Sequence, residues 1–123
     1  MGEQFITSKP IYLQIAERVM KKIVRGHLQP GSKLPSVREL ALQFKVNPNT
    51  IQRTYSELER MEIVATRRGQ GTFVTSDEAI LAELREQLKR EHVNMFVNDM
   101  KEMGVGFEEA MRIVRDAYGE GDR

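Results

Sequence analysis

The chain has 123 residues, which is room for one small domain with an appendage and excludes a large enzyme core. It contains no cysteine, and its two histidines, His27 and His92, lie far apart, so we expect no disulfide, no metal site and no cofactor. The start of the chain lacks a signal-peptide pattern, and no segment has the roughly 18 uninterrupted apolar residues of a membrane span. We therefore expect a soluble, cytoplasmic protein without a membrane partner.

The net charge of +1 hides an asymmetry between the two parts of the chain. Residues 1–75 hold 12 Lys and Arg against 6 Asp and Glu, whereas residues 76–123 hold 7 against 12. A basic first part and an acidic second part suggest that only the first meets a polyanion, although charged surfaces are often lopsided without such a partner. The charge pattern thus divides the chain into a basic part, residues 1–75, and an acidic tail, residues 76–123.

Two helices are predicted before the centre of the chain. Residues 10–25 place apolar side chains at helical spacing, and Gly26 suits the end of that helix. A run with two prolines and a glycine then breaks the pattern. Ser36 and Glu39 have the spacing of a capping box, which predicts a second helix over residues 37–44.

The run Asn-Pro-Asn-Thr at residues 47–50 resembles a loop but predicts the start of a third helix. The side chain of Asn47 can accept a hydrogen bond from the first turn, and Pro48 loses only an amide that would have no partner there. Apolar residues line one face of this helix: Ile51, Tyr55 and Leu58. At about 100° per residue, the opposite face is polar. That face carries Asn49, Arg53 and Ser56, with Gln52 on its flank.

A β-hairpin is predicted after the third helix. Two β-prone runs, residues 63–66 and 72–75, are joined by Arg-Arg-Gly-Gln-Gly, whose glycines permit a tight turn. The tip of the hairpin would carry Arg67, Arg68 and Gln70. Three helices followed by a basic hairpin form a winged helix-turn-helix, in which the third helix enters the major groove and the wing reaches the backbone or the minor groove. The polar face of the third helix is thus the predicted recognition face.

Over residues 10–75 the sequence resembles the DNA-binding domain of the GntR family of bacterial transcription regulators. Three motifs carry the resemblance: L-x-P-G-x-x-L-P-S-x-R-x-L, V-x-x-x-T-I and R-x-G-x-G-T-F-V, in this order within residues 28–74. Most members of that family have a large C-terminal effector domain, but only 48 residues remain after residue 75. The chain therefore resembles the short-tailed YtrA-like branch, in which the tail is a pair of helices that dimerises.

The resemblance implies a set of DNA-binding residues. Arg38 matches the family's backbone contact, while Asn and Gln near the start of the third helix suit adenine and Arg suits guanine or phosphate. Fatty-acid-responsive relatives carry arginine at the positions of Pro48 and Gln52, so their base contacts, and with them the operator sequence, do not carry over. The predicted DNA-binding residues are Ser36, Arg38, Asn47, Asn49, Thr50, Gln52, Arg53, Arg67, Arg68, Gly69, Gln70, Gly71 and Thr72.

Residues 77–103 contain neither proline nor glycine and predict a helix of roughly 40 Å. One apolar stripe is expected along it: Leu81, Leu84, Leu88, Met95 and Phe96. Gly104 and Gly106 end this helix, and a second amphipathic helix follows, so we expect the two to pack as an antiparallel pair. His92 and Asp99 interrupt the stripe, which favours a packed dimer of helix pairs over a long coiled coil. The predicted dimerisation residues are Leu81, Leu84, Leu88, Phe96, Phe107, Met111, Val114 and Tyr118.

These elements predict a mainly α fold with a small β-hairpin: an N-terminal winged helix-turn-helix followed by a C-terminal helical pair for dimerisation. The expected function is that of a sequence-specific transcription regulator, a homodimeric repressor whose partners are an inverted-repeat operator in double-stranded DNA and its own second copy. A small-molecule effector is left open. No catalytic grouping of residues indicates an enzyme.

Two other functions are compatible with the sequence. In the first, the tail binds a small molecule or ion through its methionines, Phe107 and Tyr118, and so gates DNA binding. In the second, the winged helix is a protein-interaction module, since a fold does not fix a function.

Overall fold

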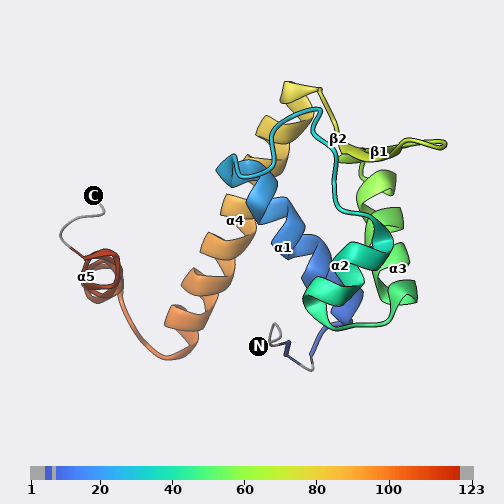
Figure 1. Ribbon diagram of the computed structural model, residues 1–123. Helices are drawn as coiled ribbons and strands as arrows, with labels where there is room; N and C mark the ends of the chain where they lie inside the picture. The colour runs from blue at the N-terminus through green and yellow to red at the C-terminus, as the bar shows by residue number, and fades with distance from the viewer. Residues whose placement is uncertain (1–4, 7, 120–123) are drawn as a thin grey trace. The chain divides into compact units, whose positions relative to one another are not determined.

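Seven elements make up the structure, a computed structural model that describes residues 5–6 and 8–119. In chain order they are α1 (Ile11–Arg25), α2 (Val37–Phe44), α3 (Pro48–Arg60), β1 (Val64–Arg67), β2 (Gly71–Val74), α4 (Glu78–Glu102) and α5 (Phe107–Tyr118) (Figure 1). The predicted class, mainly α with one small β-hairpin, is confirmed. The chain forms two compact units, Met1–Arg85 and Glu86–Arg123, so that α4 begins in the first and ends in the second.

Helix α3 is the centre of the first unit and packs against both α1 and α2. Its residues Ile51 and Leu58 are fully buried, as is Ile15 of α1. Burial of each such aliphatic side chain contributes roughly 1.5–3 kcal/mol. Because the apolar residues of α3 recur at helical spacing, this packing leaves the opposite, polar face of the helix at the surface.

A buried hydrogen bond joins α3 to the first turn of α1. Thr54 is 0% exposed, and its hydroxyl donates to the carbonyl oxygen of Tyr12 at 2.8 Å, with the carbonyl oxygen of Thr50 at 3.1 Å. A buried hydroxyl without a partner is costly, so this position requires an acceptor on α1. The helical spacing predicted the apolar face of α3 but not this polar residue within it.

The N-terminal ends of α2 and α3 are capped as their sequences predict. The Ser36 hydroxyl accepts from the amide of Glu39 at 3.1 Å, and the Glu39 carboxylate accepts from the amide of Ser36 at 2.8 Å, which completes the capping box. Asn47 caps α3, because its Oδ1 accepts from the amide of Asn49 at 2.7 Å. Between the helices, Lys45 adopts a left-handed conformation with φ of 59° and turns the chain from α2 towards α3.

The hairpin is displaced by one residue from the prediction at both strands. Strands β1 and β2 are antiparallel, and their last pair is Arg67 with Gly71. Ile63 stays outside β1 because its amide donates to the carbonyl of Leu58 at 3.0 Å and closes the end of α3. Gly69 has φ of 75°, which lets a three-residue turn begin directly after Arg67. Arg67 therefore lies in a strand, and the prediction that it sits at the tip was wrong.

A segment before α2 extends the wing on its other side. The amide of Leu34 donates to the carbonyl of Thr72, and the amide of Val74 donates to the carbonyl of Ser32, both at 2.8 Å. Lys33 lies between these bonds and forms an isolated antiparallel bridge with Phe73. Residues 32–34 thus run beside β2, an arrangement that the sequence pattern did not predict.

Helix α4 begins where Asp77 accepts a hydrogen bond from the amide of Ala79 at 3.0 Å. Its 25 residues span roughly 37 Å. A first apolar face carries Leu81, Leu84 and Leu88. A second carries Val93, Phe96, Val97 and Met100, roughly 140° further round the helix. The prediction of a single stripe was therefore wrong, and Met95, which was assigned to it, is 57% exposed.

Helix α5 follows a short turn in which Gly104 has φ of 75° and the amide of Val105 donates to the carbonyl of Met100. Its apolar side chains share one face, as predicted, but few contacts join α4 and α5 in the described part of the chain. The predicted antiparallel packing within one chain is therefore wrong. Phe107 and Tyr118 of α5 are accordingly left exposed.

Candidate nucleic-acid interface

The polar face of α3 is the first part of the candidate interface. Asn49, Gln52 and Arg53 are exposed there, while Thr50 is half-buried. Asn47 is exposed too, and although its oxygen is used by the cap, its two N–H donors remain. These side chains offer donors and acceptors of the kind that read base edges in the major groove.

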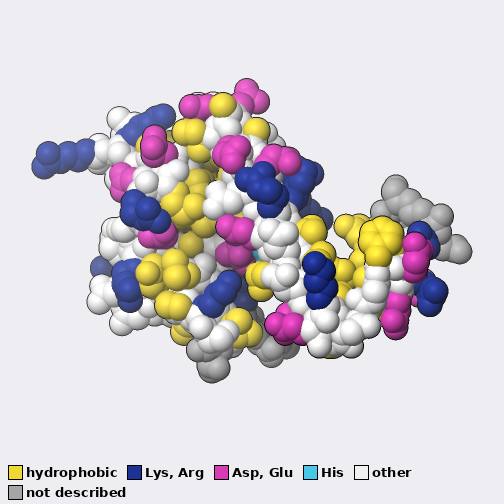
Figure 2. All heavy atoms as spheres, turned by 180° about the vertical axis from the view of Figure 1, so that it is seen from behind, with side chains coloured by type: hydrophobic (Ala, Val, Ile, Leu, Met, Phe, Trp, Pro, Cys, Tyr) yellow, Lys and Arg dark blue, Asp and Glu magenta, His cyan; other side chains and the backbone are white. Residues whose placement is uncertain are grey.

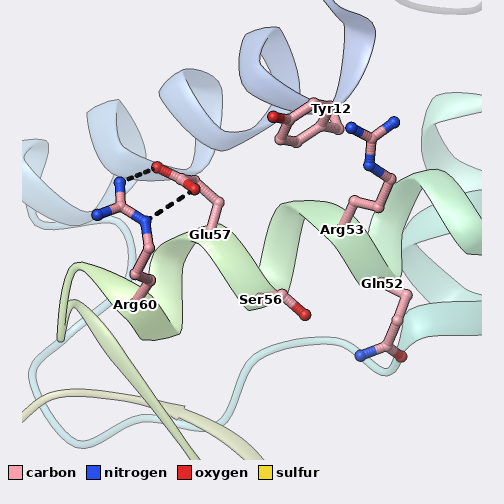
Figure 3. A pocket seen from close by; sticks show the side chains of 6 residues that line it. All are labelled: Tyr12, Gln52, Arg53, Ser56, Glu57 and Arg60. Atoms are coloured by element: carbon pink, nitrogen blue, oxygen red, sulfur yellow. Dashed lines mark hydrogen bonds and ion pairs between the residues drawn. The ribbon is translucent and has the colours of Figure 1, made fainter.

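An open hollow of about 310 Å³ runs along this face. Figure 3 shows the six residues that line it: Tyr12, Gln52, Arg53, Ser56, Glu57 and Arg60. Gln52 and Arg53 point to opposite sides of α3, and Arg53 reaches towards α1. The guanidinium carbon of Arg53 lies 4.0 Å from the centre of the Tyr12 ring, a cation–π contact.

The second arginine of the hollow is paired. Arg60 donates to both carboxylate oxygens of Glu57, one of them at 3.1 Å through its Nε (Figure 3). These bonds hold the pKa of Glu57 below its ordinary value, so that the carboxylate stays charged and offsets Arg60. The positive charge of the hollow is therefore concentrated at Arg53, near the start of α3.

The start of α2 supplies a third group of donors. Arg38 is exposed in the first turn of α2, two residues after Ser36. The hydroxyl oxygen of Ser36 accepts within the capping box, which leaves its O–H free to donate. Both side chains can approach a phosphate without disturbing the helix.

The wing holds its cations against fixed surfaces. The guanidinium of Arg67 lies 4.4 Å from the centre of the Phe73 ring. The side chain of Lys33 passes over Gly71 so closely that a Cβ there would lie 2.8 Å from Lys33 Cε. Figure 2 shows Lys and Arg side chains extending from the projecting end at the left of that view.

The other predicted wing residues lie at or next to the tip. Arg68, Gly69 and Gln70 are exposed, and the amide of Gln70 closes the turn by donating to the carbonyl of Arg67 at 2.9 Å. Thr72 is half-buried in β2, with its hydroxyl 3.4 Å from that of Thr66. The first unit thus carries every residue that was predicted to bind DNA, on α2, α3 and the wing.

Sequence reasoning missed two residues of this surface. Lys33 was not assigned because the loop around it has no periodic pattern, and only its pairing with β2 places it on the wing. Tyr12 belongs to residues 10–25, whose apolar side chains were expected to share one helical face, yet it is half-buried and its ring contacts Arg53. A tyrosine among aliphatic residues is the only signal that the sequence offers for such a role.

The predicted dimerisation residues differ in how far the single chain already covers them. Leu84 is 4% exposed and Leu88 is also buried, whereas Leu81, Phe96 and Val114 are half-buried. On α5, Phe107 is 73% and Tyr118 is 62% exposed, and Met111 is exposed as well. The apolar surface that is open to a partner is therefore found mainly on the second face of α4 and on α5.

Among the residues that the structure describes, no group of three or more His, Asp or Glu is arranged to hold a metal ion. Within the same residues, no helix is both long and apolar enough to cross a membrane.

The sequence of α1 to β2 matches a known family. The model described as "Bacterial regulatory proteins, gntR family" covers residues 11–74, more than half of the chain. The chain belongs to this family. The GntR resemblance of the sequence is thus confirmed, and the match includes α2, α3 and the whole wing.

Two relatives extend the similarity into the tail. The HTH-type transcriptional regulator YhcF of Bacillus subtilis (strain 168) is 56% identical over 115 residues, which are 94% of this chain and 95% of YhcF. The HTH-type transcriptional repressor YtrA of the same organism is 36% identical over 111 residues, 89% of this chain and 85% of YtrA. The resemblance to the short-tailed YtrA-like branch is therefore confirmed as well.

Solved structures agree with this assignment. A GntR family transcriptional regulator from Listeria monocytogenes has a TM-score of 0.83 at 41% identity and covers 89% of this chain and 96% of its own. The DNA-binding domain of AraR, in complex with operator ORX1, has a TM-score of 0.54 at 31% identity over 61% of this chain and 90% of its own. The chain is thus a transcriptional regulator of the GntR family with a DNA-binding domain.

Proposed function

We propose that the protein is a homodimeric, sequence-specific repressor that occupies an inverted-repeat operator in the cytoplasm. The observation that carries the proposal is the exposed polar face of α3 beside a cation-bearing wing on one folded unit. Repression is proposed because YtrA, which resembles the chain over most of its length, is named a repressor. Operator binding is proposed because the DNA-binding domain of AraR shares this fold and was solved with its operator.

The proposed contacts fall into two classes. Asn49 and Gln52 read base edges, because amide groups match the donor and acceptor pattern of adenine, and Arg53 binds a guanine edge or a phosphate. The remaining side chains contact the sugar–phosphate backbone of the DNA. Such contacts position the protein but carry little sequence information. This second class comprises Ser36, Arg38, Asn47 and Thr50 near the two helix starts, with Lys33, Arg67, Arg68, Gln70 and Thr72 on the wing.

The two predicted domains are proposed to have separate functions: residues 1–75 bind DNA, and residues 76–123 dimerise. One recognition helix reads only a few base pairs, so useful discrimination needs two helices about one turn of DNA apart. The tail is proposed to hold that spacing by pairing with the tail of a second copy.

Exposed apolar side chains support a second copy as the partner of the tail. Phe107, Met111 and Tyr118 share a face of α5 that α4 of the same chain does not cover. Figure 2 shows apolar side chains at the surface of the smaller body at the right of that view. A contiguous apolar surface of this kind is a common mark of a protein interface, and in homo-oligomers the same patch serves both copies.

Selection of bound sequences from random duplex DNA tests the proposal and returns the operator. We expect enrichment of two related half-sites in inverted orientation, centred about one helical turn apart. Enrichment of a single half-site by a monomer would contradict the homodimer. No enrichment at all would contradict sequence-specific binding and favour a protein-interaction role for the winged helix.

A further inference from the structure

The contact between Tyr12 and Arg53 joins two helices at the edge of the proposed recognition face. Tyr12 lies in the first turn of α1 and Arg53 in the second turn of α3, 41 residues later. Figure 3 shows the Arg53 guanidinium beside the Tyr12 ring at one end of the hollow, away from the paired Glu57 and Arg60. The guanidinium carbon is 4.0 Å from the ring centre.

A buried hydrogen bond between α3 and α1 lies next to this contact. The residue next to Arg53 is Thr54, whose buried hydroxyl donates to the backbone carbonyl of Tyr12 at 2.8 Å. The hydrogen bond therefore fixes the two helices to one another at the same place where the side chains meet. Because the bond uses the backbone of Tyr12, a substitution of the side chain leaves its acceptor in place.

A guanidinium stacked on a ring keeps its hydrogen-bonding edge. When such a contact uses the face of the planar group, its N–H donors lie in the plane and point outward. In the described part of the chain Arg53 forms no ion pair, whereas Arg60 is bound by Glu57. Arg53 is thus oriented by a neutral partner and retains both its charge and its donors for a ligand.

We infer that Tyr12 is a positioning residue that orients Arg53 for bidentate binding of an acceptor pair on DNA. The inference rests on the proposed function of α3 and goes beyond it by assigning a role to a residue of α1. The acceptor pair is either the edge of a guanine or the oxygens of a phosphate, which present similar geometry to a guanidinium. Orientation before binding reduces the loss of side-chain freedom that binding otherwise requires.

The experiment is a double-mutant cycle on the full chain, with affinity for the selected operator measured over the same series of salt concentrations for every variant. Tyr12→Phe keeps the ring and is expected to bind as the wild type does. Tyr12→Leu removes the ring face, and we expect an affinity about 3- to 10-fold lower. In an Arg53→Ala background, Tyr12→Leu should change the affinity less than about 2-fold, because nothing is left to orient.

A second variant does not depend on the folding of Tyr12→Leu. Arg53→Lys keeps the positive charge but removes the planar fork, so we expect a loss of operator affinity like that of Tyr12→Leu, with no further loss when the two are combined. Wild-type affinity of Arg53→Lys, or an equal effect of Tyr12→Leu with and without Arg53, would overturn the inference. The second result would show that Tyr12 only supports the fold.

A guanine edge and a phosphate predict different effects of Tyr12→Leu on DNA binding, and either effect supports the inference. A guanine contact predicts that Tyr12→Leu relaxes discrimination at one base pair. A phosphate contact predicts a uniform loss and a salt dependence that is shallower by about one ion. If the wild type itself selects no operator, the proposed function fails and the inference fails with it. If the wild type binds and the cycle shows no coupling, the inference alone fails.

Discussion

The side chain of Lys33 occupies the space that a side chain at Gly71 would need, with its Cε 2.8 Å from the position of a Cβ. The glycine has φ of 123°, a conformation that other residues adopt only with strain. Gly71 therefore serves two purposes in the wing, because it permits the backbone of the turn and leaves the path of Lys33 open.

Gly71→Ala is expected to destabilise the first unit by about 1–2 kcal/mol and to displace Lys33 from its path. If Lys33 contacts a phosphate, both Gly71→Ala and Lys33→Ala should reduce the salt dependence of DNA binding by about one ion. Gly69→Ala is the matched control, since Gly69 also has positive φ but no atom lies within 4 Å of its Cβ position. The idea is wrong if Gly69→Ala alters the salt dependence as much as Gly71→Ala does.

Residues that contact base edges and residues that contact phosphates should affect DNA binding differently. Gln52→Ala is expected to cost about 1–3 kcal/mol at the preferred operator and to relax sequence choice, because it removes a base contact. Arg38→Ala should instead weaken binding to all duplexes alike, with a shallower salt response. Affinities for the operator and for single-base variants of it, measured at several salt concentrations, make the comparison. A uniform loss for Gln52→Ala would place that residue among the backbone contacts.

The stability of the first unit should fall at high pH because of Tyr55. Its hydroxyl donates to the carbonyl of Pro35 at 2.6 Å, and burial raises its pKa from 10.0 to about 12. The folded protein thus holds this proton more tightly than the unfolded chain does. The associated stability is fully present below pH 10 and is lost as the pH rises from about 10 to about 12.

Tyr55→Phe removes this titration and is the control. We expect the variant to be less stable by about 1 kcal/mol at neutral pH, because the carbonyl of Pro35 loses its donor. Its unfolding free energy should then fall less steeply between pH 10 and pH 12 than that of the wild type. Denaturant unfolding at a series of pH values measures both effects, and identical slopes for the two proteins would contradict the assignment.

Dimerisation should depend on the exposed face of α5. Phe107→Asp places a charge on that face while keeping a residue suited to the first turn of a helix, so we expect the protein to sediment as a folded monomer. Arg112→Ala changes the net charge by the same amount, roughly 140° round the helix, and should leave the dimer intact. A dimeric Phe107→Asp, or an equally monomeric Arg112→Ala, would remove this face from the interface.

Local patterns predicted those parts of the fold that depend on neighbours in sequence. The capping box of Ser36 and Glu39 and the cap at Asn47 depend on side chains that are two or three residues from their partners, so spacing alone was sufficient. Lys33 and Thr54 depend on partners about 40 residues away, and no periodicity signals such a contact. The surface of α3 was therefore predictable, whereas its support by α1 was not.

The error in the tail has a different origin. One stripe was drawn from Leu81 to Phe96 because steps of three, four, and seven or eight residues match helical spacings, although small deviations accumulate over four turns. By Phe96 the apolar face has rotated, and the two halves of α4 present different surfaces. Short helices such as α2 leave no room for this drift, and the prediction of its bounds, residues 37–44, was correct.

In the proposed dimer, two copies of α3 read one operator together at a fixed spacing. Insertion of about five base pairs between the half-sites of the selected operator rotates one half-site by about half a turn of DNA. We expect the full-length protein then to bind only as tightly as it binds an isolated half-site. Unchanged affinity after the insertion would contradict this expectation.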